Sequence, residues 1–326
     1  MSVSVWSRCF WSNWVSDLFT DLIGQPLAVN LLTAALQNQR LAPAYLFAGP
    51  EGVGRRLAAL RLLEGVLAGG VLSSRQRRRL MERNHPDLLW LEPTYQHQGR
   101  LFTCAEAEAA GLSRRTPPQL RLEQIRSVSR FLARQPVEAE RGMVVIEAAE
   151  AMPEAAANAL LKTLEEPGHG LLILLTAAPE RLLSTIRSRC QLIRFLRLGD
   201  GDVQTVLQRC GEQKQDPLEL LAMAAGSPGA LLEHRRQRDA LPVDLVERLE
   251  ALPQEPMQAL ALARDLCESL DGQQQLWLID WWQQKLWRCG AGSGTMHRLE
   301  TLRRHLLGFV QPRLAWEVAL LDLSVN

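Results

Sequence analysis

The sequence predicts an α/β fold: a parallel sheet covered by helices, followed by two all-helical domains. The first observation is the segment 143–190, which alternates strand-like and helix-like runs. The second is a short apolar run, 44–48, which leads through a glycine-rich turn into a helix. The third is that strand-like runs stop after residue 198. Strands that alternate with helices in this way form a parallel sheet with helices on its faces.

The segment 143–190 contains the clearest strand–helix–strand unit. Met143–Ile146 is a short apolar run, as expected for a strand that is buried on both faces. The helix that follows carries Leu160 and Leu164 one turn apart and ends before Pro167. The run 171–176 is the second buried strand. A connection of this length is a crossover, so the two strands lie parallel.

Polar residues follow the strands and the last helix of this segment. Glu147 comes directly after the first strand, Thr176 ends the second, and Ser188-Arg189 follows the last helix. In open α/β sheets, ligands bind at the edge where the carboxyl ends of the strands meet. We therefore expect these four residues to lie at a ligand-binding edge.

The rest of the first domain repeats the alternation of strands and helices. The stretch 93–118 is polar and has no clear period, so we expect a surface insertion there. The other expected elements are a helix opened by 21–26, a strand at 44–48, a helix from Gly54 to Gly69, a basic helical piece at 71–84, a strand at 87–91, a helix at about 122–133 and a strand at 191–195.

These patterns divide the chain into four parts. The α/β domain spans 17–198, a small helical domain spans 199–240, and a third, all-helical domain spans 241–326. Residues 1–16 form a tail to which we assign no function. The third domain carries a tryptophan stripe at helical spacing, which is typical of a core or a subunit interface. The stripe consists of Trp277, Trp281, Trp282 and Trp287.

Composition limits the classes of function. The chain has 326 residues and a formal net charge of +1, so it has no overall electrostatic signature of nucleic-acid binding. Its six cysteines are scattered without a CxxC pair, which argues against a zinc module and a disulfide framework and fits the reducing cytoplasm. No apolar run approaches the length that spans a bilayer, so no membrane segment is expected.

The glycine-rich turn matches a phosphate-binding P-loop in which the chemistry is damaged. Gly49, Gly52 and Gly54 stand between a strand and a helix, as in that motif. A working loop continues with Lys, which binds phosphates, and then Ser or Thr, which binds Mg²⁺. Here these positions hold Arg55 and Arg56, and a guanidinium has no acceptor for a cation. We favour a loop that keeps its shape without a functional nucleotide site.

The strand end at Glu147 is altered in a similar way. An active ATPase has Asp here, to help hold Mg²⁺, and then Glu, to orient the attacking water. This chain has Glu147 and Ala148, and alanine carries out no acid–base chemistry. Glu150 is a substitute only if the register slips, and a helical turn would point it elsewhere. A non-catalytic strand end is the better interpretation.

Two motifs carry a family resemblance. The run Asn158–Pro167 (NALLKTLEEP) and the later Ser188-Arg189-Cys190 resemble the signature of bacterial sliding-clamp loader subunits, AAA+ proteins of the DNA polymerase III complex. The resemblance covers the chain from Asp21 to Cys190 and, more loosely, the helices beyond. It implies a RecA-like AAA+ domain, a small helical lid and a helical collar. It also implies that Arg189 is an arginine finger that reaches the γ-phosphate bound by a neighbouring subunit, with Ser188 and a sensor-like Thr176 beside it. The alternative role for Arg189 is to cap its own helix or to form an ion pair.

The departures from the family pattern distinguish two types of subunit. The ATP-hydrolysing gamma/tau motors have an intact loop, an Asp-Glu strand end and an Arg in a Gly-Ser-x-Arg pattern. Here all three are lost, and Gly229 stands at the last position. The sequence therefore resembles the non-hydrolysing delta prime type. This type implies gamma/tau and delta subunits as partners, with sliding clamp and primed DNA reached through the complex. ATP and Mg²⁺ would be bound by the neighbour, and no zinc is expected, since 65–90 holds no cysteine.

Two other functions remain open from the sequence. The first is a divergent, gamma/tau-like AAA+ ATPase, in which Arg55 and Glu147 replace Lys and Asp. The second is a DNA-binding adaptor outside the polymerase. Its basic patches would be 75–83, 114–115 and 235–238, although solvated helix faces explain such runs more often.

Overall fold

The computed structural model describes residues 17–68, 73–111, 117–212, 214–308 and 310–324. They divide into two compact units. The sheet-bearing unit holds the described residues up to 212 together with 226–228, and the helical unit holds the others. The expected boundaries at 198 and 240 remain a prediction, and the expected tail at 1–16 lies outside the described residues.

The sheet-bearing unit contains a five-stranded parallel sheet in the order β2-β5-β6-β1-β7. Val144 of β5 lies opposite Leu172 of β6, which confirms the parallel pairing expected of the strand–helix–strand unit. The central strands β1, β5 and β6 are buried throughout, because helices cover both faces. The strands are β1 (Ala44–Ala48), β2 (Leu88–Leu91), β5 (Met143–Ile146), β6 (Leu171–Thr176) and β7 (Gln191–Arg194).

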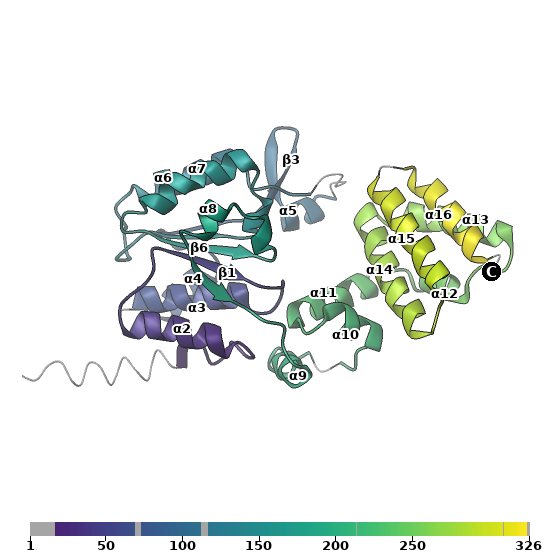
Figure 1. Ribbon diagram of the computed structural model, residues 1–326, viewed down its shortest axis with the longest axis horizontal. Helices are drawn as coiled ribbons and strands as arrows, with labels where there is room; N and C mark the ends of the chain where they lie inside the picture. The colour runs from purple at the N-terminus through teal and green to yellow at the C-terminus, as the bar shows by residue number, and fades with distance from the viewer. Residues whose placement is uncertain (1–16, 69–72, 112–116, 213, 309, 325–326) are drawn as a thin grey trace, which may run out of the picture. The chain divides into compact units, whose positions relative to one another are not determined.

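Helices lie on both faces of this sheet (Figure 1). One face is covered by α2 (Pro26–Gln37), α3 (Arg55–Ala68) and α4 (Ser74–Met81). The other face is covered by α6 (Leu122–Leu132), α7 (Glu154–Glu165) and α8 (Ser184–Arg187). On that face, aliphatic side chains of alternate strand residues pack with the helices into one core. Short 3-10 helices follow β5 and β6, at Ala149–Ala151 and Pro179–Arg181, and α9 (Asp200–Arg209) completes the regular elements of the unit.

The expected surface insertion at 93–118 is more regular than the sequence indicated. Its described part forms an antiparallel hairpin, β3 (Thr94–His97) and β4 (Arg100–Thr103), and then α5 (Cys104–Ala109). The hairpin turn places Gln98 and Gly99 in the left-handed region, with φ of 48° and 79°. Left-handed residues at both central positions suit a tight hairpin turn. The expectation of a surface insertion stays a prediction, and its part 94–109 contains two strands and a helix.

The helical unit packs around tryptophans. Trp277, Trp281 and Trp282 are buried, which confirms the core role, whereas Trp287 is 65% exposed. The indole N–H of Trp316 donates to Gln275, and that of Trp277 donates to His234. These bonds satisfy polar atoms that burial would otherwise leave unpaired. The helices are α10 (Leu218–Ala224), α11 (Pro228–Asp239), α12 (Val243–Ala251), α13 (Pro256–Ser269), α14 (Gly272–Arg288), α15 (Ser293–Leu307) and α16 (Pro312–Ser324).

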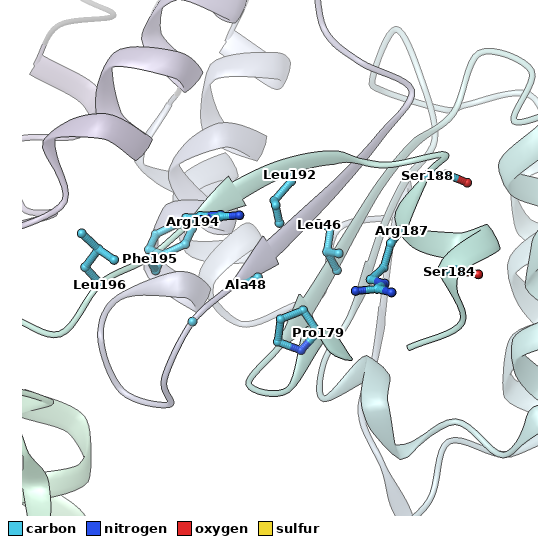
Figure 2. A pocket seen from close by; sticks show the side chains of 11 residues that line it. Leu46, Ala48, Pro179, Ser184, Arg187, Ser188, Leu192, Arg194, Phe195 and Leu196 are labelled. Atoms are coloured by element: carbon cyan, nitrogen blue, oxygen red, sulfur yellow. The ribbon is translucent and has the colours of Figure 1, made fainter. Parts of the chain in front are cut away.

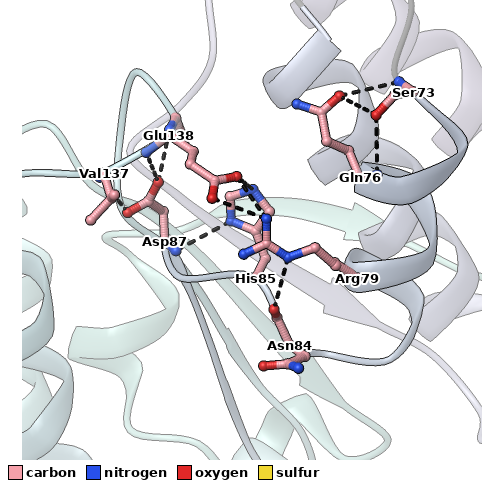
Figure 3. A network of polar contacts seen from close by, with 9 residues as sticks. Ser73, Gln76, Arg79, Asn84, His85, Asp87, Val137 and Glu138 are labelled. Carbon is pink, nitrogen blue, oxygen red and sulfur yellow. Dashed lines mark hydrogen bonds and ion pairs between the residues drawn. The ribbon is translucent and has the colours of Figure 1, made fainter.

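A buried carboxylate fixes the start of the sheet (Figure 3). Asp87, just before β2, accepts the backbone N–H groups of Val137, Glu138 and Ala139, each at 2.7 Å. Burial alone would raise the pKa of Asp87, but the three donors outweigh it and the pKa lies below its usual value. The N–H of Asp87 donates to Nδ1 of His85, whose pKa is lowered by burial. The loop before β5 is thus held against the loop before β2.

We expect Asp87→Asn to lower the free energy of unfolding of the sheet-bearing unit by about 1.5–3 kcal/mol. The change removes the charge that strengthens three hydrogen bonds and leaves one acceptor oxygen in place of two. Urea denaturation with hydrogen exchange of residues 137–146 measures the effect. Glu180→Gln, the same change at an exposed position, is the control and should stay within about 0.5 kcal/mol. Equal stability of the two variants would contradict the role given to Asp87.

Candidate functional site

The glycine-rich turn after β1 has the shape of a phosphate loop, and two of its glycines occupy positions where a side chain would clash or strain the backbone. A Cβ on Gly49 would lie 2.3 Å from the carbonyl oxygen of Phe195. Gly54 has a φ of 105°, which side chains rarely tolerate. The hydroxyl of Ser227 donates to the carbonyl of Glu51 within the turn. Contacts inside the protein therefore require the glycines, with or without a ligand.

The two residues at the position of the missing Lys and Ser/Thr differ in their surroundings. Arg55 begins α3 and is partly buried, and burial lowers its pKa despite the nearby carboxylates of Glu51, Glu150 and Glu147. Its Nη1 is buried and has no hydrogen-bond partner among the described residues. The side chain of Arg56 is 57% exposed and forms an ion pair with Glu147.

Glu147 is the centre of a closed polar cluster. Its side chain is 12% exposed and accepts the guanidinium of Arg56 on one oxygen. Its other oxygen accepts Arg83, at 3.1 Å, and the indole N–H of Trp90. Arg83 also lies over the ring of Trp90, with 4.6 Å between its Cζ and the ring centroid. Both carboxylate oxygens are therefore engaged by cations or donors of the same chain.

This cluster joins the two altered positions of the nucleotide motif. The resemblance to motor subunits predicts metal-binding groups at the positions of Arg56 and Glu147. The sequence analysis treated the two substitutions separately, and the structure brings them into direct contact. A guanidinium at this place supplies positive charge to the carboxylate, as a metal ion would in an active site.

Polar side chains near the ends of the neighbouring strands also form hydrogen bonds within the chain. Glu150 accepts the N–H of Ala177 at 3.0 Å, so its carboxylate lies at the end of β6. Ala148 has a φ of 44°, which turns the chain sharply after β5. Thr176 is fully buried, and its hydroxyl oxygen accepts the N–H of Ala178 at 3.2 Å. The sensor-like role of Thr176 remains a prediction.

Arg189 lies just beyond α8 and contacts its own chain. Its Nη1 donates to the carbonyl of Thr185 at 3.0 Å, and its Nη2 donates to the carboxylate of Glu165 at 2.7 Å. The side chains of Arg189 and Glu165 are 36% and 52% exposed. The hydroxyl of Ser188 donates to Thr185, and burial raises the pKa of Cys190 to about 12, so its thiol is inert. The alternative contacts for Arg189, a helix cap and an ion pair, are thus both present.

A feature that the sequence analysis missed is a cavity of about 520 Å³ near Arg189 (Figure 2). We call it the β7 cavity. Its walls are mainly apolar, and its lining includes two arginines, Arg187 of α8 and Arg194 of β7. No sequence pattern marks such a space, because it results from an uncovered part of the sheet. The remaining lining residues are Leu46, Ala48, Gly49, Pro179, Ser184, Ser188, Leu192, Phe195 and Leu196.

Most arginines of the basic stretch 75–83 have carboxylate partners, and the exposed Arg75 is the exception among the described residues. Within it, Arg77 pairs with the buried Glu64 and Arg79 pairs with Glu138. Arg78 and Arg83 have carboxylate partners as well. In the patch 235–238, Arg235 pairs with the buried Asp216. Residues 114–115 lie outside the described part of the chain. Intrachain pairing reduces the charge available to DNA phosphates.

Two other expectations concern membranes and metals. Within the described residues, every helix is too short or too polar to cross a bilayer. In the same residues, no group of three or more His, Cys, Asp and Glu side chains is placed to hold a metal ion. The expectation that the fold contains no zinc stays a prediction.

Comparison with protein families gives two matches that together span most of the chain. Residues 24–199 match the family model described as DNA polymerase III, delta subunit. Residues 201–323 match the model of the cyanobacterial DNA polymerase III delta prime C-terminal domain.

Individual proteins give a consistent result. The chain is 34% identical over 177 residues to the DNA polymerase III subunit delta' of Bacillus subtilis, which covers 52% of this chain and 47% of that protein. It is 35% identical over 196 residues to the corresponding subunit of Pseudomonas aeruginosa, covering 57% and 54%. The chain thus spans about half the length of these curated relatives. A crystal structure of a DNA polymerase III gamma subunit-related protein from Thermotoga maritima has a TM-score of 0.52 and 18% identity, covering 90% of this chain and 98% of that one, which supports the fold.

We expect Glu147→Ala to destabilise the protein by about 1–3 kcal/mol, because Arg56 loses its counter-charge, Arg83 keeps only Glu92, and the indole N–H of Trp90 loses its acceptor. Arg56→Ala should cost less than about 1 kcal/mol, since its side chain is largely exposed and Glu147 keeps two other donors. A double-mutant cycle with urea denaturation measures the coupling between the two residues. A coupling energy of zero would show that the contact does not contribute to stability.

Proposed function

Because the chain belongs to the DNA polymerase III delta subunit family and carries a C-terminal domain of the delta prime type, we propose that it is a non-hydrolysing clamp-loader arm. In this role it acts as a stator and supplies Arg189 in trans to the ATP bound by a neighbouring gamma/tau-type subunit. The proposed result is loading of the sliding clamp on primed DNA during replication.

The observation that carries the proposal is the contact between Arg56 and Glu147. A motor subunit needs both positions free to hold Mg²⁺ beside the phosphates. Here the two side chains neutralise each other, and Arg83 and Trp90 occupy the rest of the carboxylate. Ala148 provides no base for water, and Gly229 provides no charge for a γ-phosphate. Four parts of one hydrolytic site are therefore altered together.

Arg189 is suited to act outside its own subunit. Among the described residues its side chain contacts Glu165 and the carbonyl of Thr185, and exposed pairs of this kind contribute about 0–1 kcal/mol. A phosphate of a bound nucleotide carries more charge than a carboxylate and accepts two parallel N–H bonds from a guanidinium. Exchange of Glu165 for a phosphate is therefore favourable once a partner presents one.

The proposal specifies partners and surroundings. The partners are the gamma/tau and delta subunits of the loader, with the clamp and primed DNA reached through the complex, in the cytoplasm. The neighbour holds ATP and Mg²⁺, and this chain requires no cofactor and no zinc. The net charge of +1 agrees with DNA contacts that are made mainly by other subunits.

One observation favours the alternative, a weak ATPase. Nη1 of Arg55 is buried without a partner among the described residues, so it has capacity to bind a phosphate. Calorimetric titration of the purified chain with ATP and Mg²⁺ separates the two functions. We expect no binding heat up to millimolar ATP, because Arg56 is paired with Glu147 where the metal would be. A Kd below about 1 μM, a binding free energy beyond about −8 kcal/mol, would overturn the stator proposal.

The finger itself is tested in a reconstituted loader by DNA- and clamp-stimulated ATP hydrolysis. We expect Arg189→Ala to remove the hydrolysis contributed by the adjacent site, because an arginine finger is worth about 10³–10⁵ in rate. Arg189→Lys should restore little, since an ammonium lacks the planar pair of donors. Arg181→Ala, a nearby exposed arginine, is the control. An unchanged rate for Arg189→Ala in an intact assembly would show that the chain is only a scaffold.

A further inference from the structure

The β7 cavity lies at the edge of the sheet, where the edge strand β7 is only partly covered. On the face packed by α6, α7 and α8, the core is centred on β5 and β6. At the β1–β7 end of that face, Leu46 lies opposite Leu192, and Ala48 lies opposite Arg194. Among the described elements, only α8 and the turn at Pro179 wall this end (Figure 2). As a result Leu192 is 38% exposed and Leu196 is 59% exposed.

The two arginines of the cavity have no counter-charge among the described residues. Arg187 and Arg194 are exposed, and neither guanidinium makes an ion pair or hydrogen bond to any described residue. By contrast, Arg189 beside them is paired with Glu165. An apolar space with two unpaired guanidinium groups at its walls is complementary to an apolar group that is flanked by carboxylates.

We propose that the β7 cavity is a docking socket for an acidic segment of the neighbouring loader subunit, which packs a large apolar side chain against Leu192. The volume, about 520 Å³, accommodates such a side chain with part of its backbone. Asp or Glu residues beside it pair with Arg187 and Arg194. This inference rests on the proposed function, since it identifies the partner as the subunit that receives Arg189.

The position of the socket gives it a second effect. Arg187 is the last residue of α8, and Arg189 follows it by two residues. A partner held against Arg187 and Leu192 is therefore fixed relative to Arg189 as well. Docking at the socket therefore sets the distance between Arg189 and the partner's nucleotide. The weak contact of Arg189 with Glu165 does not set this distance.

Cross-linking in the reconstituted loader identifies the occupant. The photoreactive residue p-benzoylphenylalanine replaces Leu192, and mass spectrometry of the irradiated complex locates the attachment. We expect attachment to the neighbouring subunit, at an apolar residue with Asp or Glu within about four positions. The same residue at Leu101, which is 45% exposed on β4, is the control and should not give this product. Attachment to residues 1–16 of this chain, to a second copy or to no protein would overturn the proposal.

Binding measurements test the chemistry of the socket. We expect Leu192→Asp and Arg194→Glu each to raise the Kd of this chain for the rest of the loader by about tenfold or more. The effect of Arg194→Glu should shrink at high salt, because it acts through charge. Leu101→Asp should leave the Kd unchanged. Circular dichroism and thermal unfolding confirm that the exposed substitutions keep the fold.

The outcomes for socket and finger are separable. If Leu192→Asp leaves assembly intact while Arg189→Ala abolishes stimulated hydrolysis, the socket is wrong and the proposed function stands. If Leu192→Asp weakens assembly while Arg189→Ala changes nothing, the finger is wrong and docking at this face stands.

Discussion

The parallel pairing of β1, β5 and β6 is the constraint on which the functional site depends. Parallel strands bring their carboxyl ends to one edge, so the residues that follow them become neighbours although they lie far apart in the sequence. The loop after β1 thereby meets Glu147, which follows β5, and Thr176, which ends β6. Each strand is buried on both faces, so a change at this edge must be accommodated by side chains and not by movement of the sheet.

Charge compensation explains why the altered edge is stable. The carboxylate of Glu147 is only 12% exposed, so it needs cations or donors at this strand end, whereas Arg56 is largely solvated. Together they form a pair, and Arg83 and Trp90 complete the coordination of the carboxylate. At this edge of the sheet, the charge of Glu147 is therefore balanced by arginines of the same chain.

Features that depend on a short run of residues were predicted from the sequence, whereas contacts between distant residues were not. The strands β1, β5 and β6 were predicted because continuous apolar runs mark burial on both faces. The pairing of Arg56 with Glu147 was not predicted, since 91 positions separate the residues and no periodicity links them. For the same reason the ion pairs of Arg77 with Glu64 and of Arg79 with Glu138 were not predicted within the basic stretch 75–83. The hairpin β3–β4 was not predicted, because its short strands carry polar residues and do not alternate between polar and apolar positions.

The contacts of Arg189 with its own chain are compatible with a role in trans. A finger that was free in the isolated subunit would lose rotamer entropy on every encounter, about 1.5–2 kcal/mol for a side chain of this length. Glu165 and Thr185 restrict Arg189 in advance, and an exposed pair is weak enough to be replaced by a phosphate. Held this way, the side chain is both oriented and exchangeable. A buried ion pair such as that of Arg235 with Asp216 offers no such exchange, because breaking it leaves a charge without solvent. The proposed action of Arg189 on a neighbouring subunit therefore depends on the exposure of this pair more than on the presence of an arginine.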